Sequence, residues 1–362
     1  MNETDLLILD TAERLLSDIC TTEAVMQYER GTVPDNLANA ILDSGLPMAW
    51  VPEQSGGVGG SLPLGFELIR KAAAYALPLP LAETLVANLL LALSGLSVPG
   101  RWTALGYDGG ELPVAMRGEV NGTVEMASGA DDASVIVVPV LEKGHLRIAS
   151  FAASTIDMEH RRNLAGEVRT RLILRSAIPS RLSARVKNLT EDGIRQFCAL
   201  VRSAQIVGAL DRSGELTVAY VAERKQFGRA LGKFQAIQNR VADIAGEAAL
   251  AGAAVQQAVR TLANCEFPLC GDSSTAIAIA SAKLVAGDAA QKVPENAHQA
   301  HGAMGFSYEY PLQLFTRRVW CWREEFGSEF YWSGYIGELL KNEVQSGGEG
   351  SVLGKAWDFA TR

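Results

Sequence analysis

Apolar residues recur at three- and four-residue steps through the first hundred positions, which is the spacing of one face of a helix. Pro34 can open one of these helices and Gly45 can cap its end. Four glycines crowd residues 56–60 and predict a loop, and because no Lys-Ser or Lys-Thr pair follows them, a P-loop is excluded. The pattern predicts helices over residues 5–30, 34–42, 64–75 and 81–93.

The pattern of residue types changes after about residue 100, where short runs of β-branched residues replace the helical spacing. Gly129 and Gly144 punctuate these runs, and Asn121-Gly122 is typical of a hairpin turn. We therefore expect a small antiparallel β domain. Its predicted strands cover residues 134–140, 145–150 and 169–174.

Helical spacing returns from about residue 188 and continues to about residue 340. One stripe runs from Phe197 to Val207 and a second from Val241 to Leu262, and both are rich in small residues. Small residues let helices approach closely, which favours a tight bundle or a subunit interface. The predicted fold class is mostly α with a small β domain: an N-terminal helical domain (1–108), a middle β domain (109–187), a C-terminal four-helix bundle (188–345) and a tail (346–362).

The composition of the chain argues against several classes of function. With 362 residues, 48% of them hydrophobic and 20% charged, the chain can bury a large core. A formal net charge of -8 argues against nucleic-acid binding. The longest apolar run, Leu85–Leu93, is too short for membrane insertion, and the acidic N-terminus lacks the basic region of a signal peptide. Five cysteines without metal-type spacing, Cys265 and Cys270 among them, indicate free thiols in a cytoplasmic protein.

The run Arg224-Lys225-Gln226-Phe227-Gly228 breaks the helical pattern, and Phe234-Gln235 opens the next helix. Arg224 is thus expected near a helix C-terminus, where the helix dipole favours a cation. The arginine offers a planar fork of hydrogen-bond donors, and Phe227 offers a flat aromatic face. Read alone, the run also fits a charged helix end, a turn and a core phenylalanine.

A second run, His298 to Pro311, carries glycines at 302 and 305 that allow close backbone approach. Together the two runs resemble the signature of the acyl-CoA dehydrogenase family, and residues 52–60 are similar to its N-terminal domain. Residues 77–84 are similar to the same stretch in bacterial members that act on bulky acyl groups, including the heteromeric type that suits steroid side-chain CoA esters. The resemblance implies an FAD cofactor bound between subunits of a dimer or tetramer, homomeric or heteromeric. It implies cofactor contacts from Arg224, Gln226, Phe227, Gln235, Gln299, Gly302 and Ser328.

The family reaction is the α,β-dehydrogenation of an acyl-CoA thioester in lipid metabolism, with an electron-transfer partner. A carboxylate removes the α-proton. The usual position of that glutamate reads Phe326 in this chain, and the neighbouring Glu325 is the candidate base if the alignment slips by one residue. The alternative is that Glu325 is a solvated helix charge. The tryptophan that covers the flavin in the family is absent from residues 123–129.

Two functional hypotheses follow, and a third stays open. The chain is a complete dehydrogenase, or it is a non-catalytic subunit that lends cofactor contacts to a base-bearing partner. The third is a structural paralogue without a flavin role. His298 and His301 stand three residues apart as a metal pair would, but without a carboxylate or cysteine in register surface or interface histidines are favoured. No metal site is predicted.

Overall fold

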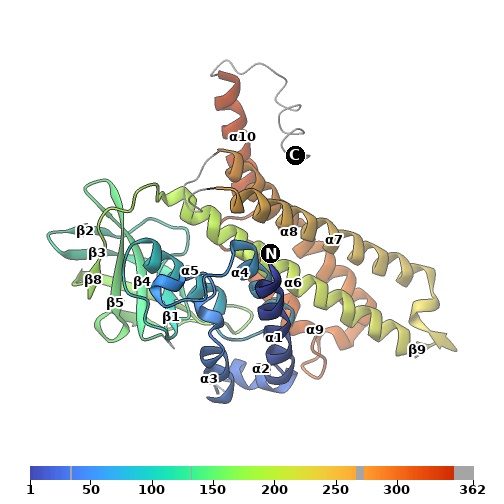
Figure 1. Ribbon diagram of the computed structural model, residues 1–362. Helices are drawn as coiled ribbons and strands as arrows, with labels where there is room; N and C mark the ends of the chain where they lie inside the picture. The colour runs from blue at the N-terminus through green and yellow to red at the C-terminus, as the bar shows by residue number, and fades with distance from the viewer. Residues whose placement is uncertain (33–34, 132, 266–272, 346–362) are drawn as a thin grey trace. The chain divides into compact units, whose positions relative to one another are not determined.

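The structure is a computed structural model that describes residues 1–32, 35–131, 133–265 and 273–345. It divides into two compact units, Met1–Leu189 and Thr190–Arg362, whose helices and strands are labelled in Figure 1. Pro34, Cys270 and the predicted tail at 346–362 lie outside the described residues. The domain boundaries inferred from the sequence stay predictions.

The first unit opens with a group of helices. The single helix predicted over 5–30 is wrong, because Thr21 accepts a hydrogen bond from the Ala24 backbone N–H and so caps the start of a new helix. Gly45 adopts the left-handed conformation expected of a helix end (φ 74°). The helices are α1 (Glu3–Ile19), α2 (Thr22–Glu29), α3 (Asp35–Asp43), α4 (Leu62–Ala74) and α5 (Leu81–Leu93).

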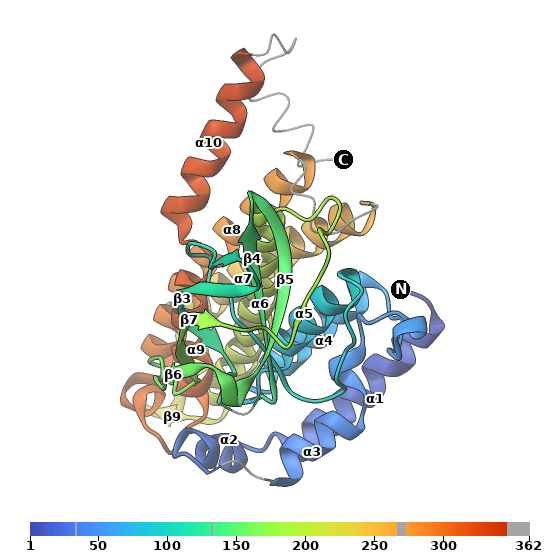
Figure 2. The ribbon, with the colours of Figure 1, turned by 90° about the vertical axis from the view of Figure 1, so that its left-hand side faces the viewer.

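A sheet follows in the same unit, drawn in green in Figure 2. Its order is β6-β7-β3-β1-β4-β5-β8, and β2 pairs with β3 and β4. The expectation of a purely antiparallel sheet is wrong, because β4 lies parallel to both β1 and β2. The strands are β1 (Thr103–Leu105), β2 (Val114–Met116), β3 (Glu119–Ser128), β4 (Val135–Glu142), β5 (His145–Ala152), β6 (Asp157–Glu159), β7 (Arg169–Ala177) and β8 (Arg181–Leu182).

The hairpin predicted at Asn121-Gly122 is also wrong, because both residues lie inside β3. The turn between β2 and β3 is at Arg117-Gly118, where φ is positive at both residues (56° and 87°). A Cβ added to Gly122 would lie 2.9 Å from the Pro113 Cα. The glycine therefore serves close packing at a register shift in the strand rather than a turn.

The second unit is a bundle of long helices in which α6, α7 and α8 pack on one another and α9 packs on α6 (Figure 1). Thr190 caps α6 by accepting from the Gly193 N–H, and the apolar stripe that starts at Phe197 is buried. Among the described residues, none of the helices has both the length and the apolar character that a bilayer span requires. The helices are α6 (Glu191–Glu223), α7 (Gln235–Ala263), α8 (Ser273–His301), α9 (Leu312–Glu324) and α10 (Glu329–Gln345). The predicted fold class is confirmed.

Candidate functional site

The predicted Arg-x-Gln-Phe-Gly element forms a small hairpin between α6 and α7. Arg224 caps the end of α6 through its backbone N–H, which donates to the Tyr220 carbonyl at 2.9 Å. β9 (Lys225–Gln226) then pairs with β10 (Arg229–Ala230). The tip is Phe227-Gly228, and both residues have positive φ (49° and 79°). A phenylalanine rarely takes this conformation, so the fold accepts strain to place that ring at the tip.

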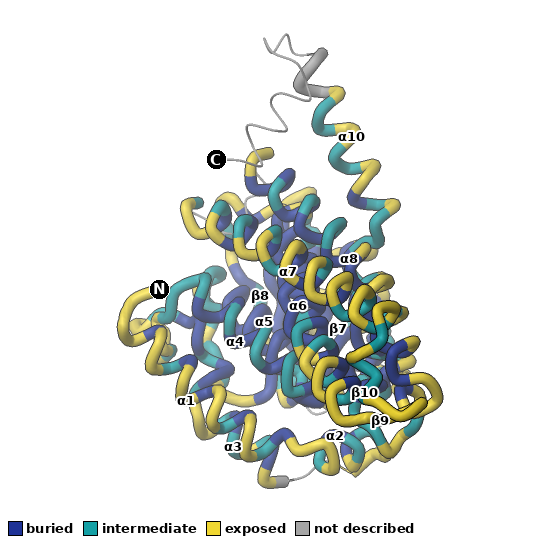
Figure 3. The backbone as a smooth tube through the Cα atoms, turned by 90° about the vertical axis from the view of Figure 1, so that its right-hand side faces the viewer, coloured by how far each residue is buried: buried dark blue, intermediate teal, exposed yellow. Residues whose placement is uncertain are grey.

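The side chains of this hairpin lie outside the protein core. Phe227 is 89% exposed, and Arg224, Gln226 and Gln235 are exposed beside it. Figure 3 shows β9 and the adjoining part of β10 in the colour of exposed residues. Phe234 supports the hairpin, because its ring meets the Phe227 ring edge-on and carries the Arg229 guanidinium at 4.1 Å. The core phenylalanine offered as an alternative is therefore excluded for Phe227.

An aromatic stack joins this end of α6 to the end of α8. The Tyr220 ring stacks on the His301 ring with centroids 4.4 Å apart, and the Tyr220 hydroxyl donates to the His301 carbonyl at 3.4 Å. Tyr310 packs on both rings and donates to the Leu216 carbonyl at 3.2 Å. The stack brings Gln299 and Gly302, both exposed, to the same end of the bundle as Arg224.

Six of the seven predicted cofactor contacts thus gather at one end of the second unit. Gly302 has φ of 60°, and no atom lies within 4 Å of where its Cβ would be, so its backbone is open to a ligand. A guanidinium, a free aromatic face and an open glycine backbone fit a nucleotide diphosphate. They project from the chain's own surface, which suits a ligand shared with another chain. The six are Arg224, Gln226, Phe227, Gln235, Gln299 and Gly302.

The turn between α9 and α10 holds the remaining predicted residues. Phe326 is buried and adopts φ of 58°, and its carbonyl accepts from the Trp332 indole N–H at 3.2 Å. Ser328 is half-buried just after it. The apolar ring at position 326 has no group that could accept a proton, so the position that the resemblance assigns to the base is chemically inert.

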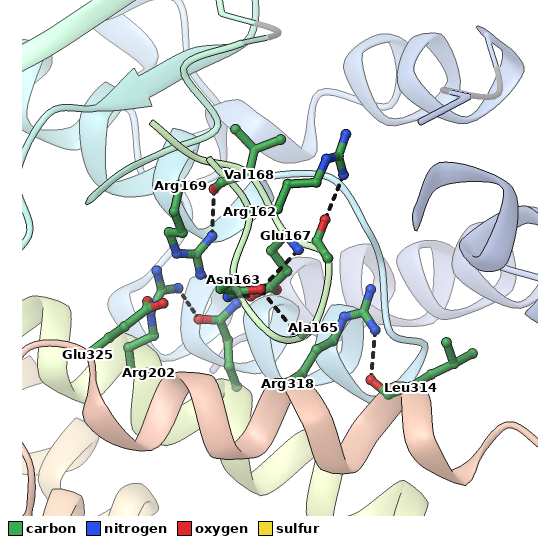
Figure 4. A network of polar contacts seen from close by, with 12 residues as sticks. Arg162, Asn163, Ala165, Glu167, Val168, Arg169, Arg202, Leu314, Arg318 and Glu325 are labelled. Atoms are coloured by element: carbon green, nitrogen blue, oxygen red, sulfur yellow. Dashed lines mark hydrogen bonds and ion pairs between the residues drawn. The ribbon is translucent and has the colours of Figure 1, made fainter. Parts of the chain in front are cut away.

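Glu325 lies in an ion pair rather than in solvent. Its carboxylate accepts from Arg202 Nε at 2.7 Å, and the Arg202 side chain is only 1% exposed. Figure 4 shows the two side chains together, with Arg202 reaching from α6. The Arg202 guanidinium also lies 5.5 Å from the centroid of the Phe326 ring. Proton abstraction by Glu325 would compete with this pair, so the geometry favours a structural role; its assignment as a base remains an untested prediction.

A buried lysine fixes the same turn from α8. Lys283 Nζ donates to the carbonyls of Arg323 at 2.6 Å and of Gly327 at 2.9 Å, so it ties together the two ends of the turn. Burial lowers the pKa of Lys283 to about 8, although the nearby carboxylates of Glu329, Glu324 and Glu325 act in the opposite direction. The turn that carries Phe326 is therefore held by two buried cations, Lys283 and Arg202.

The two groups of predicted residues are far apart in one chain. Arg202 and Arg224 are 22 residues apart along α6, which corresponds to about 33 Å at the helical rise per residue. The hairpin and the turn at Phe326 therefore belong to opposite regions of the bundle. A single dinucleotide site formed by one chain alone would have to bridge that distance.

His298 and His301 are buried, so the expectation of surface or interface histidines is wrong. His298 Nε2 lies 2.9 Å from Thr316 Oγ1, and its ring stacks between Phe306 and Trp320. Burial and the neighbouring His301 lower the pKa of His298 to about 4, and burial lowers the pKa of His301. Both rings are thus neutral aromatic core members. Within the described ranges, no cluster of three or more candidate metal ligands occurs.

Sequence reasoning missed Arg202, Lys283 and the stack made by Tyr220 and Tyr310. Arg202 and Lys283 carried a signal, because each is a charge set among mostly small and apolar residues of a segment with helical spacing. The Tyr220 stack carried none, since Tyr220 is 81 residues away from His301 and meets it only in the folded bundle.

The sequence of the chain is similar to those of known proteins. The family model described as "Acyl-CoA dehydrogenase, C-terminal domain" matches residues 198–329. The acyl-CoA dehydrogenase IpdE2 of Mycolicibacterium smegmatis is 29% identical over 327 residues, which cover 88% of this chain and 93% of the relative. The acyl-CoA dehydrogenase FadE34 of Mycobacterium tuberculosis is 26% identical, over 86% of this chain and 44% of its own length. This chain thus spans less than half of FadE34.

The fold is also found among solved structures. A chain of the ChsE4-ChsE5 complex from Mycobacterium tuberculosis superposes with a TM-score of 0.83 at 19% identity, over 94% of this chain and 98% of that chain. At this identity the likeness speaks for the shared architecture alone.

Proposed function

Because the chain belongs to the acyl-CoA dehydrogenase family, we propose that it serves an FAD-dependent α,β-desaturation of an acyl-CoA thioester. We propose further that it does so as the subunit that lends cofactor contacts, while a partner chain carries the base. The complete-dehydrogenase hypothesis, with Glu325 as base, is the alternative. FAD, when bound, supplies the hydride-accepting chemistry of the reaction.

The observation that carries the proposal is the turn at residues 324–328. Phe326 fills the position where the resemblance expects a carboxylate, and its ring is buried. Glu325, the nearest substitute, is engaged by the buried Arg202 at 2.7 Å. A general base must be free to take up a proton within hydrogen-bond reach of its substrate. Neither residue meets that requirement, so the chain supports binding better than proton abstraction.

The hairpin between α6 and α7 supports the cofactor-binding part of the proposal. Arg224 can donate paired hydrogen bonds to a diphosphate, and Phe227 can stack on an adenine ring. Gln226, Gln235 and Gln299 offer amides to the same ligand, and the backbone of Gly302 lets it approach. Ser328 lies at the distant turn and would contact a second cofactor site. The proposal therefore gives the chain contacts to FAD at an interface rather than within one protomer.

The relatives make a heteromeric arrangement reasonable, because one similar structure is the ChsE4-ChsE5 complex. We propose as partners an acyl-CoA substrate, an electron-transfer protein and a base-bearing subunit of the same family. A cytoplasmic location is part of this proposal.

The purified chain tests the division of labour between the subunits. We expect the chain alone to hold well below one FAD per chain and to show no bleaching of flavin absorbance with octanoyl-CoA. Co-expression with a family member that has glutamate at the position of Phe326 should raise both flavin content and bleaching. A yellow protein with one FAD per chain that bleaches on its own would rule out the helper role and favour the complete enzyme.

Arg224→Ala tests the role of the hairpin. A charge-assisted hydrogen bond is worth about 1.5–3 kcal/mol, so we expect FAD retained by the co-expressed assembly to weaken by roughly ten- to a hundredfold. The exposed neighbour Lys225→Ala is the matched control and should leave FAD affinity unchanged. Urea unfolding of both variants should match the wild type. Unchanged FAD affinity in Arg224→Ala would remove the hairpin from the site.

A further inference from the structure

Positive charge is concentrated in one stretch of the first unit, where β8 follows β7. Between Glu167 and Glu191 the sequence has five arginines and one lysine, and it has neither aspartate nor glutamate. The formal net charge of the whole chain is -8. The remainder of the chain is therefore more acidic than this total, and the cations of this stretch stand apart from it.

The first two of these cations are neutralised by neighbouring carboxylates, and the others are not. Arg169 pairs with Glu167 at 3.0 Å, and Arg171 pairs with Glu125 at 3.0 Å. The side chains of the next four are exposed and make no hydrogen bond or ion pair within the described part of the chain. These exposed cations are Arg175, Arg181, Arg185 and Lys187.

Two serines hold this stretch along the edge of the sheet. The Ala152 backbone N–H donates to the Ser180 hydroxyl at 3.2 Å. Ser183 is buried and exchanges two hydrogen bonds with the backbone of Ile148, each of 2.9 Å. Figure 1 shows β8 beside β5, with which it pairs at the end of the strand order. The backbone that carries Arg181 is therefore fixed.

An exposed apolar residue lies among the cations. Ile178 is 73% exposed, between the end of β7 and the start of β8. Cations on an edge strand can also serve to block its pairing with other strands. That role does not explain Ile178, and it does not explain Arg185 and Lys187, which lie beyond the two residues of β8. Apolar side chains with Lys or Arg beside them are instead the combination by which protein segments lie on anionic membranes.

We propose that residues 175–187 form a peripheral docking segment for an anionic lipid surface. The exposed cations contact the headgroup phosphates, and Ile178 enters the boundary between headgroups and acyl chains. The same surface repels the acidic remainder of the chain, so the distribution of charge turns this segment toward the lipid. The contact is peripheral and reversible, because one isoleucine and a few cations bury far less apolar surface than a transmembrane helix.

The expected strength of the contact follows from the number of cations. Each cation near an anionic bilayer strengthens binding by roughly fivefold, so the exposed cations together contribute on the order of several hundredfold. Salt screens this attraction, because the Debye length falls from about 10 Å at about 0.1 M ionic strength to about 3 Å at about 1 M. The inference stands independently of the flavin role, since it uses no residue of the hairpin or of the turn at Phe326.

Flotation of the purified full-length chain with lipid vesicles tests the docking segment. The vesicles contain equal amounts of phosphatidylglycerol and phosphatidylcholine, or phosphatidylcholine alone. We expect binding to the anionic vesicles only, at about 0.1 M salt, and release at about 1 M salt. Arg181→Glu and Arg185→Glu should each weaken binding about tenfold or more, because each reversal removes an attraction and adds a repulsion. Ile178→Ala should weaken binding roughly threefold to tenfold and leave its salt dependence unchanged.

Arg30→Glu is the matched control, since it makes the same change of charge at an exposed position at the end of α2, and it should bind vesicles as the wild type does. All variants should keep the circular dichroism spectrum of the wild type. The proposal is overturned by a chain that ignores anionic vesicles, by equal binding to neutral vesicles, or by reversals no stronger in effect than the control.

Inorganic phosphate separates a lipid headgroup from a soluble phosphate ligand. Phosphate and chloride at equal ionic strength should release the chain from anionic vesicles equally, because screening alone weakens the contact. Stronger release by phosphate would assign the exposed cations to a soluble phosphate compound and refute the lipid surface. Flavin content measured on the same samples reports separately on the proposed function.

Discussion

The ion pair between Arg202 and Glu325 makes a prediction that separates the two roles considered for Glu325. Removing one partner of a buried pair leaves an uncompensated charge and costs about 3–5 kcal/mol. Glu325→Gln should therefore lower the free energy of unfolding by an amount in this range, because Arg202 is buried. Urea denaturation followed by circular dichroism measures it.

Glu324→Gln is the matched control, because Glu324 is exposed one residue earlier and should change stability by less than about 0.5 kcal/mol. If Glu325 were instead a catalytic base, the glutamine variant would lose turnover and keep its stability. Equal stabilities of the two variants would contradict the structural role assigned here.

The buried His298 predicts a loss of stability in mild acid. Its pKa in the folded protein is lowered from 6.5 to about 4, so the unfolded chain binds the proton more readily. The stabilising contribution is complete above pH 6.5 and is lost as the pH falls toward 4. At about pH 5 the free energy of unfolding should be lower by about 2 kcal/mol from this residue.

Urea titrations at about pH 7.5 and about pH 5 measure this difference. His298→Gln should reduce the pH dependence, whereas the exposed His145→Gln should preserve it in full. His301, which stacks on Tyr220 and has a lowered pKa as well, will add to the wild-type slope. An identical pH dependence in the wild type and in His298→Gln would show that protonation of His298 does not destabilise the folded protein.

Much of the candidate site was predictable from single residues, and its surroundings were not. Arg224 follows the last turn of α6 and Gln235 opens α7 because glycines break the helical period between them, which is a local signal. The pairing of Glu325 with Arg202 joins residues 123 positions apart. The spacing of residues near Glu325 does not indicate Arg202 as its partner. The sequence alone therefore could not decide whether Glu325 is a solvated charge or a base.

At the scale of elements, the space around two glycines predicts opposite effects when each is replaced by alanine. The first glycine lies in the turn at residues 302–306, against which α8 and α9 pack. A Cβ at Gly305 would lie 2.9 Å from His298 Nδ1 and 3.1 Å from His301 Cβ. Gly305→Ala should therefore cost about 1–3 kcal/mol through overpacking. Gly334→Ala, inside α10 with open space around it, should stabilise by up to about 1 kcal/mol through helix propensity.

Thermal unfolding of the two glycine variants measures both effects. Opposite shifts of the melting temperature are expected, downward for Gly305→Ala and upward for Gly334→Ala. An unchanged melting temperature in Gly305→Ala would mean that the histidine rings move aside to make room for the added methyl group. The contact between the end of α8 and the start of α9 would then not be tightly packed.

Elements with a strong local signal were predictable, and those set by distant contacts were not. The bounds of α5 are those expected from the apolar run that follows Pro80, because helix period and a stop signal agree there. Asn121-Gly122 has the same local appearance as a turn, yet the pairing of β3 with β7 carries it through as a strand. The parallel pairing of β1 with β4 likewise depends on chain crossings that no short window of sequence contains.

At the scale of the whole molecule, the division at Leu189 and Thr190 predicts that the second unit folds by itself. Its helices bury their apolar stripes on one another, with α6 packed against α7, α8 and α9, and all residues of the proposed hairpin belong to it. A chain of residues 190–362 should therefore give a strongly helical circular dichroism spectrum and unfold cooperatively in urea. A fragment that is unfolded would show that the bundle depends on the first unit for its stability. Only a folded fragment with one cooperative transition agrees with a bundle that is stable by itself.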